Sequence, residues 1–314
     1  MTTVRSYSKI NLGLHIGPPR PDGYHHLATI YQTIELHDLV TVTANVAGET
    51  HITLRCQHPG VPCDERNTAY KAVAMALDAL EIKAVVEITI NKRLPVQGGI
   101  GAGSANAAAA ILALEAELGR QLPANDRLAL AGKVGSDVPM FFVGGTMLGI
   151  ERGEETFPLP DLPSFHIVTA FPGVGVSTPQ AFRDWDARLT QSAENDRLGE
   201  FRRRVAMAFA GQPGVSGKAG DLAEEPLLAL VRTGLENDFE TVVFPQQPSL
   251  RALKSALEEG SLYAALSGSG SSLFGLYRTE EAAQAAQQRV RSLGCEARQT
   301  RTLPRSEYWA TIFV

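Results

Sequence analysis

The stretch Gly98-Gly99-Ile100-Gly101-Ala102-Gly103 joins a strand-like run to an alanine-rich helix. Residues 85–90 before it are mostly apolar and β-branched, and residues 104–114 after it are rich in alanine. Glycines that open a helix expose consecutive backbone N–H groups, and the helix dipole favours an anion at that end. The stretch therefore predicts a phosphate-binding loop. The alternative is a tight turn that lets a helix of small residues pack closely on a sheet.

This glycine loop matches neither of two familiar phosphate-binding motifs. In the P-loop pattern a lysine follows the second glycine, but Ser104 stands at that position. In the dinucleotide pattern that starts at Gly99 and Gly101, the third glycine would again fall on Ser104. If the loop binds phosphate, it belongs to another class.

Composition predicts an ordinary globular protein. The chain has 314 residues, so about two domains are expected. Its 29 basic and 34 acidic residues give a net charge of -5, which does not favour a nucleic-acid partner. No apolar run approaches the roughly 20 residues needed to span a bilayer, so no membrane partner is expected.

The cysteines indicate a reducing compartment. There are three, Cys56, Cys63 and Cys295, and none forms a C-x-x-C pair. With no signal segment at the N-terminus, a cytoplasmic location is expected. The histidines near Cys56 and Cys63 match no zinc spacing, so the sequence assigns no metal ligand.

Two segments near the N-terminus carry polar residues that could serve a site. Residues 7–16 alternate as a strand, which places Lys9 and Asn11 on one face about 7 Å apart. A solvated strand face is the plainer interpretation. The turn at residues 20–23 is followed by Tyr24 and His25, which could stack on a planar ligand or form the wet tip of a hairpin.

The rest of the first half predicts strands and helices in alternation. Strands are expected over 28–34 and 39–44, and helices over 67–80 and 126–133. In Ser136-Asp137-Val138-Pro139, Asp137 looks locally like the N-cap of a short helix.

The second half predicts a layer of sheet and helices after the proline-rich residues 157–163, interpreted as a linker. Its expected elements resemble a split β-α-β arrangement: strands over 165–170, 263–266, 273–277 and 296–303, and helices over 201–209, 249–258 and 280–293. A second glycine-serine loop, residues 267–272, is either a close-approach anion loop or a plain turn. Residues 183–225 suggest no chemistry. An α+β fold follows, with domains over 1–157 and 164–314.

Four features in this order resemble the superfamily of galactokinase, homoserine kinase, mevalonate kinase and phosphomevalonate kinase (GHMP). They are the strand with Lys9, the glycine loop, residues 136–139 and the loop 267–272. Residues 8–12 and 20–25 are similar to the members that phosphorylate the 2-hydroxyl of a cytidyl-linked methylerythritol in isoprenoid precursor synthesis. The resemblance implies an N-terminal ribosomal-protein-S5-like domain, which binds ATP, and a C-terminal ferredoxin-like domain.

The resemblance also implies roles for individual residues. Lys9 and Asp137 would be the catalytic pair: the carboxylate accepts the hydroxyl proton, and the ammonium favours the ionised carboxylate and offsets charge during transfer. ATP and Mg²⁺ would be the cofactors, and the protein a monomer or homodimer. The residues implied for ATP are Asn67, Pro95, Gly98, Gly99, Gly101, Gly103, Ser104 and Asn106, and those implied for the alcohol substrate are Asn11, Tyr24, His25 and Thr178.

Two positions depart from the family pattern. Ala102 replaces a glycine, and Ala105 stands where a second serine is usual. A serine at 105 is therefore expected to gain a contact to phosphate or Mg²⁺. Two rivals stay open: a GHMP kinase acting on a different alcohol, and a nucleotide-binding homologue with weakened catalysis.

Overall fold

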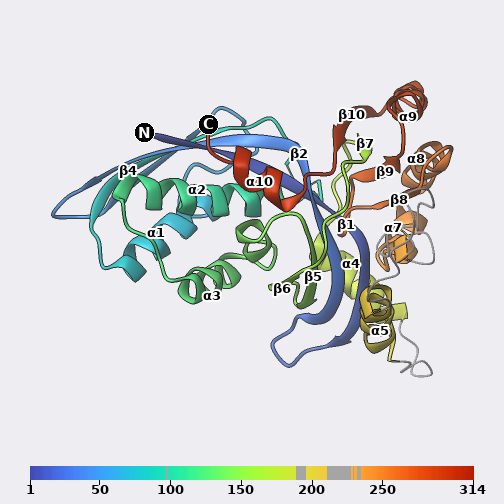
Figure 1. Ribbon diagram of the computed structural model, residues 1–314, viewed down its shortest axis with the longest axis horizontal. Coiled ribbons are helices and arrows are strands. Elements are labelled where there is room, and N and C mark those ends of the chain that lie inside the picture. Colours follow the sequence, from blue (N-terminus) through green and yellow to red (C-terminus); the bar gives the residue numbers. More distant parts are fainter. Residues whose placement is uncertain (97, 189–195, 211–227, 229, 232–234) are drawn as a thin grey trace, which may run out of the picture.

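The computed structural model describes all residues except 97, 189–195, 211–227, 229 and 232–234. Figure 1 shows two sheets with their helices packed on them. The described elements, in chain order, are β1 (Thr2–Pro19), β2 (His25–Val46), β3 (His51–Cys56), α1 (Thr68–Leu80), β4 (Ala84–Asn91), α2 (Ala102–Leu118), α3 (Ala124–Val134), η1 (Pro139–Phe142), β5 (Thr146–Glu151), β6 (Glu155–Pro158), β7 (His166–Phe171), α4 (Thr178–Arg188), α5 (Arg197–Ala210), α7 (Glu240–Gln246), α8 (Pro248–Glu258), β8 (Tyr263–Leu266), β9 (Leu273–Tyr277), α9 (Glu280–Ser292), β10 (Glu296–Arg301) and α10 (Arg305–Thr311).

The first sheet is built around β2, which is long enough to pair with three strands. It pairs with β1 along one edge, and along the other with β5 near its start and β4 near its end. The predicted strands over 28–34 and 39–44 are thus one continuous strand. The register shifts between Tyr7 and Ser8 of β1, where β2 has two extra residues, Glu35 and Leu36, and the pairing continues on both sides.

Helix α2 is buried on nearly all sides, which explains its alanine content. It packs against β1, β2 and α1, and its small side chains allow these elements to approach closely. The strand before it, β4, alternates strictly between buried and exposed residues, as a half-buried strand should. The glycine loop therefore connects a strand of the first sheet to the helix that packs on that sheet.

The second sheet has four antiparallel strands in the order β10-β7-β9-β8. Helices α8 and α9 pack against it, with Leu250, Leu257 and Val290 fully buried. A separate cluster joins the two sheets, where Ile10 and Ile34 meet Ile167 and Phe274. The middle of β1 therefore lies at the junction of the two layers.

The last residues of the chain return to the first sheet. Phe313 forms an isolated antiparallel bridge with Val4, and the Val314 N–H donates to the Thr3 carbonyl at 3.0 Å. The two termini consequently lie side by side (Figure 1). Among the described residues, no helix has the length and apolar character needed to cross a membrane.

The interpretation of Lys9 and Asn11 as part of a solvated strand face is wrong. Lys9 is 3% exposed and Asn11 1% exposed. Both faces of β1 are covered, because α2 packs on this strand in addition to the cluster that joins the two sheets. An ammonium is almost never fully buried unless it has partners, so Lys9 requires them.

Candidate active site

The glycine loop ends in a helix N-terminus that carries no side-chain cap. Gly101 is the N-cap residue of α2 and has a φ of 70°, a conformation that glycine adopts without strain. The first internal bond of the helix runs from the Ala105 N–H to the Gly101 carbonyl at 2.8 Å. The amides of residues 102–104 precede that bond, so they are available to an anion.

A cavity of about 370 Å³ opens at this helix end. Its walls include Gly98, Gly99, Gly101, Gly103 and Ser104 from the loop, and Asn67 and Pro95 from its flanks, as the sequence predicts. The lining also includes the side chains of Arg66 and Lys92, and no carboxylate among the described residues. The backbone N–H groups form an environment suited to a polyphosphate, whereas Arg66 and Lys92 are paired with Asp64 and Asp38.

Lys9 and Asp137, predicted from distant segments, form an ion pair beside this loop. The Lys9 Nζ lies 3.3 Å from the Asp137 Oδ2, and the Asp137 side chain is 30% exposed. The same ammonium donates to the Asn11 Oδ1 at 2.6 Å and to the Gly99 carbonyl at 3.1 Å. Lys9 is thus held by three partners, one of which belongs to the glycine loop.

Asp137 does not cap the short helix that follows it. The N-cap residue of η1 is Val138, and no side chain caps that helix. The carboxylate instead accepts a hydrogen bond at its Oδ1 from the Tyr31 hydroxyl, at 2.9 Å. Burial, followed by the charge of Asp137, raises the pKa of Tyr31 well above its usual value, so this phenol keeps its proton and donates.

The sequence analysis missed Tyr31, although strand pairing gives a signal for it. Tyr31 is the cross-strand partner of Asn11, and Thr33 is the partner of Lys9. Opposed residues in an antiparallel pair project from the same face. Pairing residues 9–11 with 31–33 would therefore have placed a phenol next to the predicted catalytic face.

The second glycine-serine loop packs directly against the first. The Ser267 hydroxyl donates to the Gly99 carbonyl at 2.9 Å, and the Ser272 N–H donates to the Gly98 carbonyl at 3.2 Å. A Cβ atom at Gly99 would lie 2.2 Å from the Ser267 carbonyl oxygen, so only glycine fits there. Loop 267–272 is therefore a close-approach loop that supports the glycine loop.

The predicted substrate residues lie along β1 and β2 and on α4. Thr178 begins α4, and its hydroxyl lies 2.7 Å from that of Ser269. At the start of β2, Tyr24 is 52% exposed, whereas His25 is 6% exposed. Among the described residues, neither Tyr24 nor His25 forms a hydrogen bond or ion pair with Lys9 or Asp137, so a ligand touching both ends would have to be elongated.

His25 has two partners on α4 that the sequence analysis missed. Its Nε2 lies 2.7 Å from the Asp186 Oδ1, and its ring stacks on Phe182 with a centroid distance of 4.8 Å. Both partners lie far from His25 in sequence and carry no motif. Asp186 falls in residues 183–225, for which the sequence indicates no role, and the structure places this residue against His25.

Asn67 and Asn106 line the cavity, but internal bonds occupy their amide groups. Asn67 caps α1, its Oδ1 accepting from the Ala69 N–H at 2.9 Å. Asn106 accepts from the Ser6 hydroxyl at 2.6 Å and donates to the Asp38 Oδ2 at 3.2 Å. Asp38 is fully buried and also pairs with Lys92 at 2.6 Å. These amides therefore shape the cavity wall through internal bonds.

The expectation that a serine at 105 would gain a ligand contact is wrong. Ala105 is 2% exposed and lies in the hydrophobic core among α1, α2 and the first sheet. It does not line the cavity, in contrast to Ser104 and Asn106 on either side. Successive helical residues point about 100° apart, so neighbours of cavity-facing residues can face the core. Ala105 is a packing residue.

Comparison with protein families and curated proteins finds one consistent group. The model of the GHMP kinases N terminal domain matches residues 67–145, and that of the GHMP kinases C terminal matches residues 221–294. A 4-diphosphocytidyl-2-C-methyl-D-erythritol kinase from Solibacter usitatus is 39% identical, covering 89% of this chain and 82% of its own length. A protein of the same name from Nostoc punctiforme is 36% identical over 92% of each chain.

Solved structures agree with these matches. A crystal structure of 4-(cytidine 5'-diphospho)-2C-methyl-D-erythritol kinase has a TM-score of 0.71 at 27% identity, covering 96% of this chain and 99% of its own. A homoserine kinase from Cytophaga hutchinsonii has a TM-score of 0.68 at 18% identity, covering 98% of this chain and 96% of its own, which shows a shared fold alone.

Proposed function

The chain belongs to the 4-diphosphocytidyl-2-C-methyl-D-erythritol kinases of the GHMP superfamily, and on that basis we propose that it transfers the γ-phosphoryl group of ATP to the 2-hydroxyl of 4-diphosphocytidyl-2-C-methyl-D-erythritol. The observation that carries the proposal is the Lys9–Asp137 pair, 3.3 Å apart and bonded to the glycine loop through Gly99. It puts a base and a cation beside the cavity suited to ATP.

Asp137 acts as the general base in this proposal. Its carboxylate is partly exposed and accepts the proton that the substrate hydroxyl loses as the oxygen attacks phosphorus. Lys9 stabilises negative charge on the transferring group, and Asn11 holds the ammonium in place through its Oδ1. Tyr31 fixes the orientation of the carboxylate from the opposite side.

The glycine cavity fits ATP. The amides at the start of α2 offset phosphate charge, and Pro95 and Asn67 form part of the cavity wall. Mg²⁺ would accompany ATP and neutralise charge on the phosphates. The lining offers it the Ser104 hydroxyl, and the remaining ligands would be phosphate oxygens and water.

The cytidyl group binds near the first residue of β2, His25, in this proposal. The exposed Tyr24 ring supplies a stacking surface, with the Arg152 guanidinium 4.8 Å from its centroid. His25 is oriented by Asp186, and the Thr178 hydroxyl contacts Ser269 of the second glycine-serine loop. An elongated nucleotide-linked alcohol spans the two ends of the site, whereas a small alcohol would not.

On the strength of the family membership we propose the names ribosomal-protein-S5-like and ferredoxin-like for the two domains, residues 1–157 and 164–314; the last residues of the second, from α10 on, pack on the first sheet. The strand order β10-β7-β9-β8 supports the second name, because it reads 4-1-3-2 in order of appearance. A cytoplasmic location is supported by the three unpaired cysteines, Cys56, Cys63 and Cys295.

A coupled assay of ADP release with a panel of alcohols tests the proposed function. We expect turnover with 4-diphosphocytidyl-2-C-methyl-D-erythritol and little with the same alcohol lacking the cytidyl group, with homoserine or with mevalonate. Efficient turnover of an alcohol without a nucleotide would favour the rival GHMP kinase. Binding of ATP with no turnover on any alcohol would favour the weakened homologue.

His25→Ala is expected to raise KM for the cytidyl substrate by about 5- to 150-fold, since one polar or stacking contact to a base contributes roughly 1–3 kcal/mol. KM for ATP should stay nearly unchanged, because His25 does not line the glycine cavity. The matched control is His26→Ala, which removes a neighbouring histidine that is paired with Glu151. An effect confined to ATP would place the two nucleotides in the opposite pockets.

A further inference from the structure

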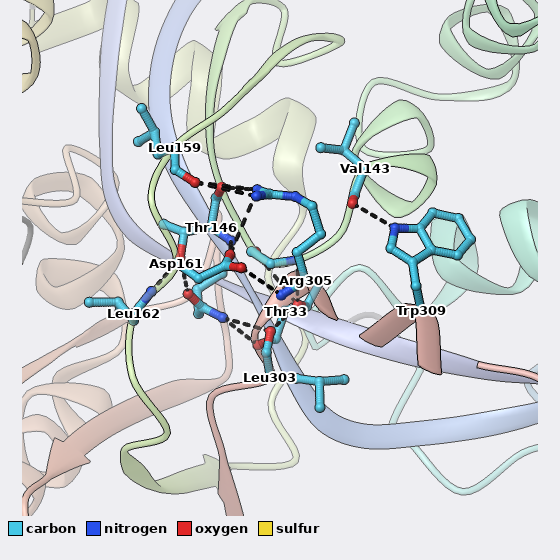
Figure 2. A network of polar contacts seen from close by, with 11 residues as sticks. Thr33, Val143, Thr146, Leu159, Asp161, Leu162, Leu303, Arg305 and Trp309 are labelled. Carbon is cyan, nitrogen blue, oxygen red and sulfur yellow. Dashed lines mark hydrogen bonds and ion pairs between the residues drawn. The ribbon is translucent and has the colours of Figure 1, made fainter. Parts of the chain in front are cut away.

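The last helix, α10, contacts the segment that carries Asp137. This segment runs from Asp137 through η1 to the first residue of β5, Thr146. The Tyr308 hydroxyl donates to the Phe141 carbonyl at 2.6 Å, and the Trp309 indole N–H donates to the Val143 carbonyl at 3.1 Å. Figure 2 shows Trp309 directed at Val143. Two consecutive residues of α10 thus bond to the backbone where η1 ends.

These bonds supply partners that the short helix cannot supply itself. Carbonyl groups in the last turn of a helix find no N–H donor within that helix. Burying such a carbonyl without a hydrogen-bond donor costs free energy. Tyr308 is 2% exposed and lies against Gly144, where an added Cβ would be 2.6 Å from its ring. The ring of Tyr308 therefore also fixes the chain where it leaves η1.

The far end of the same segment is fixed by Arg305. Its guanidinium donates to the Thr146 carbonyl at 2.7 Å, and its backbone N–H donates to the Asp161 Oδ2 at 2.8 Å. Asp161 in turn accepts from the Thr146 N–H at 2.9 Å. Figure 2 shows this network where residues 159–162, β2 and α10 meet. It holds the segment in place downstream of η1.

Phe141 connects this attachment to the reacting groups. A Cβ added to Gly101 would lie 3.0 Å from the Lys9 Cγ and 3.1 Å from the Phe141 Cζ, so the ring packs beside the Lys9 stem and the glycine loop. The Phe141 N–H donates to the Val138 carbonyl at 3.2 Å, one residue after Asp137. A shift of Phe141 would therefore move both partners of the ion pair.

We propose that α10 is a positioning element for phosphoryl transfer, and that Tyr308 is the positioning residue that holds Asp137 against Lys9 through the Phe141 carbonyl. The inference rests on the proposed role of Asp137 as the base. In this proposal the C-terminal residues that pack on the first sheet also serve catalysis. A small displacement of a reacting group lowers the rate of the chemical step.

Tyr308→Phe tests the inference, because it removes the hydroxyl and keeps the ring. We expect kcat to fall about tenfold while KM for ATP and for the cytidyl substrate changes by less than about twofold. The matched control is Tyr277→Phe, which removes a buried hydroxyl that donates to the Leu257 carbonyl at 2.6 Å in the second layer. Both variants should lose similar thermal stability, and only Tyr308→Phe should lose turnover.

Tyr308→Phe and Tyr277→Phe are also measured in combination with Asp137→Asn. These double variants distinguish failure of the inference about Tyr308 from failure of the assignment of Asp137 as the base. If Tyr308 acts through Asp137, its loss should cost little turnover in the Asp137→Asn background. Equal losses in both backgrounds, or equal kcat values for Tyr308→Phe and Tyr277→Phe, would overturn the inference and leave the base assignment intact. An active Asp137→Asn enzyme would overturn that assignment and the inference with it. If Tyr308→Phe does not fold, Trp309→Phe removes the neighbouring donor and is measured in its place.

Discussion

Asp137→Asn is expected to lower kcat by about 10²–10⁴ with little change in melting temperature. The amide keeps one oxygen for the Lys9 ammonium, which lies 3.3 Å from the carboxylate, and its NH2 group can donate to the Tyr31 hydroxyl, which now donates to the carboxylate at 2.9 Å, so the local structure should survive. The amide cannot accept the hydroxyl proton, and it no longer carries the charge that faces Lys9. Steady-state rates with ATP and the cytidyl substrate, together with thermal denaturation, measure the two effects.

Asp126→Asn is the matched control for Asp137→Asn. Asp126 is an exposed carboxylate in the first turn of α3, the helix that precedes Asp137. Its loss changes the charge of the protein equally but should leave kcat unchanged. If Asp137→Asn turns over at close to the wild-type rate, Asp137 is not the base.

Lys9→Met is expected to lower kcat by about 10²–10³, because it removes the buried cation that we propose stabilises the transferring group. Methionine keeps the stem that packs beside Gly101 and Phe141, whereas Lys9→Ala removes it as well. A comparison of kcat and melting temperature for the two variants separates loss of the charge from loss of packing. Lys71→Met, at an exposed position on α1, is the control.

The double variant Lys9→Met with Asp137→Asn tests whether the two residues act as a unit. Its kcat should fall by much less than the product of the single effects, since each residue depends on the other. Multiplicative losses would mean that Lys9 and Asp137 contribute to turnover independently, against their placement in one ion pair.

Local patterns in the sequence predicted most of the elements. Strands over 263–266 and 273–277 are confirmed at the same bounds, and the helix over 67–80 is confirmed with Asn67 as its N-cap. These elements follow from alternation, helical periodicity and capping, which act over a few neighbouring residues. The helix after the glycine loop is also confirmed, beginning two residues earlier than residue 104.

Other features depended on contacts between distant segments. Burial of Lys9 requires α2 on one side of β1, and the pairing of His25 with Asp186 joins residues 161 positions apart. The core-facing direction of Ala105 depends on how α2 is rotated against the sheet. None of these three features can be recognised from a local pattern in the sequence.

The sequence by itself determined the loop chemistry: glycines before a helix create a place for phosphate, because their backbone geometry is intrinsic to those residues. Through the family resemblance it also pointed to Lys9 and Asp137, the proposed catalytic pair. Only the tertiary structure decided that these two meet, that Tyr31 is their third member, and that α10 reaches back to the segment after Asp137. The reason is physical: local propensities act within a few residues, whereas an ion pair between positions 9 and 137 exists only after the sheet and α2 have packed.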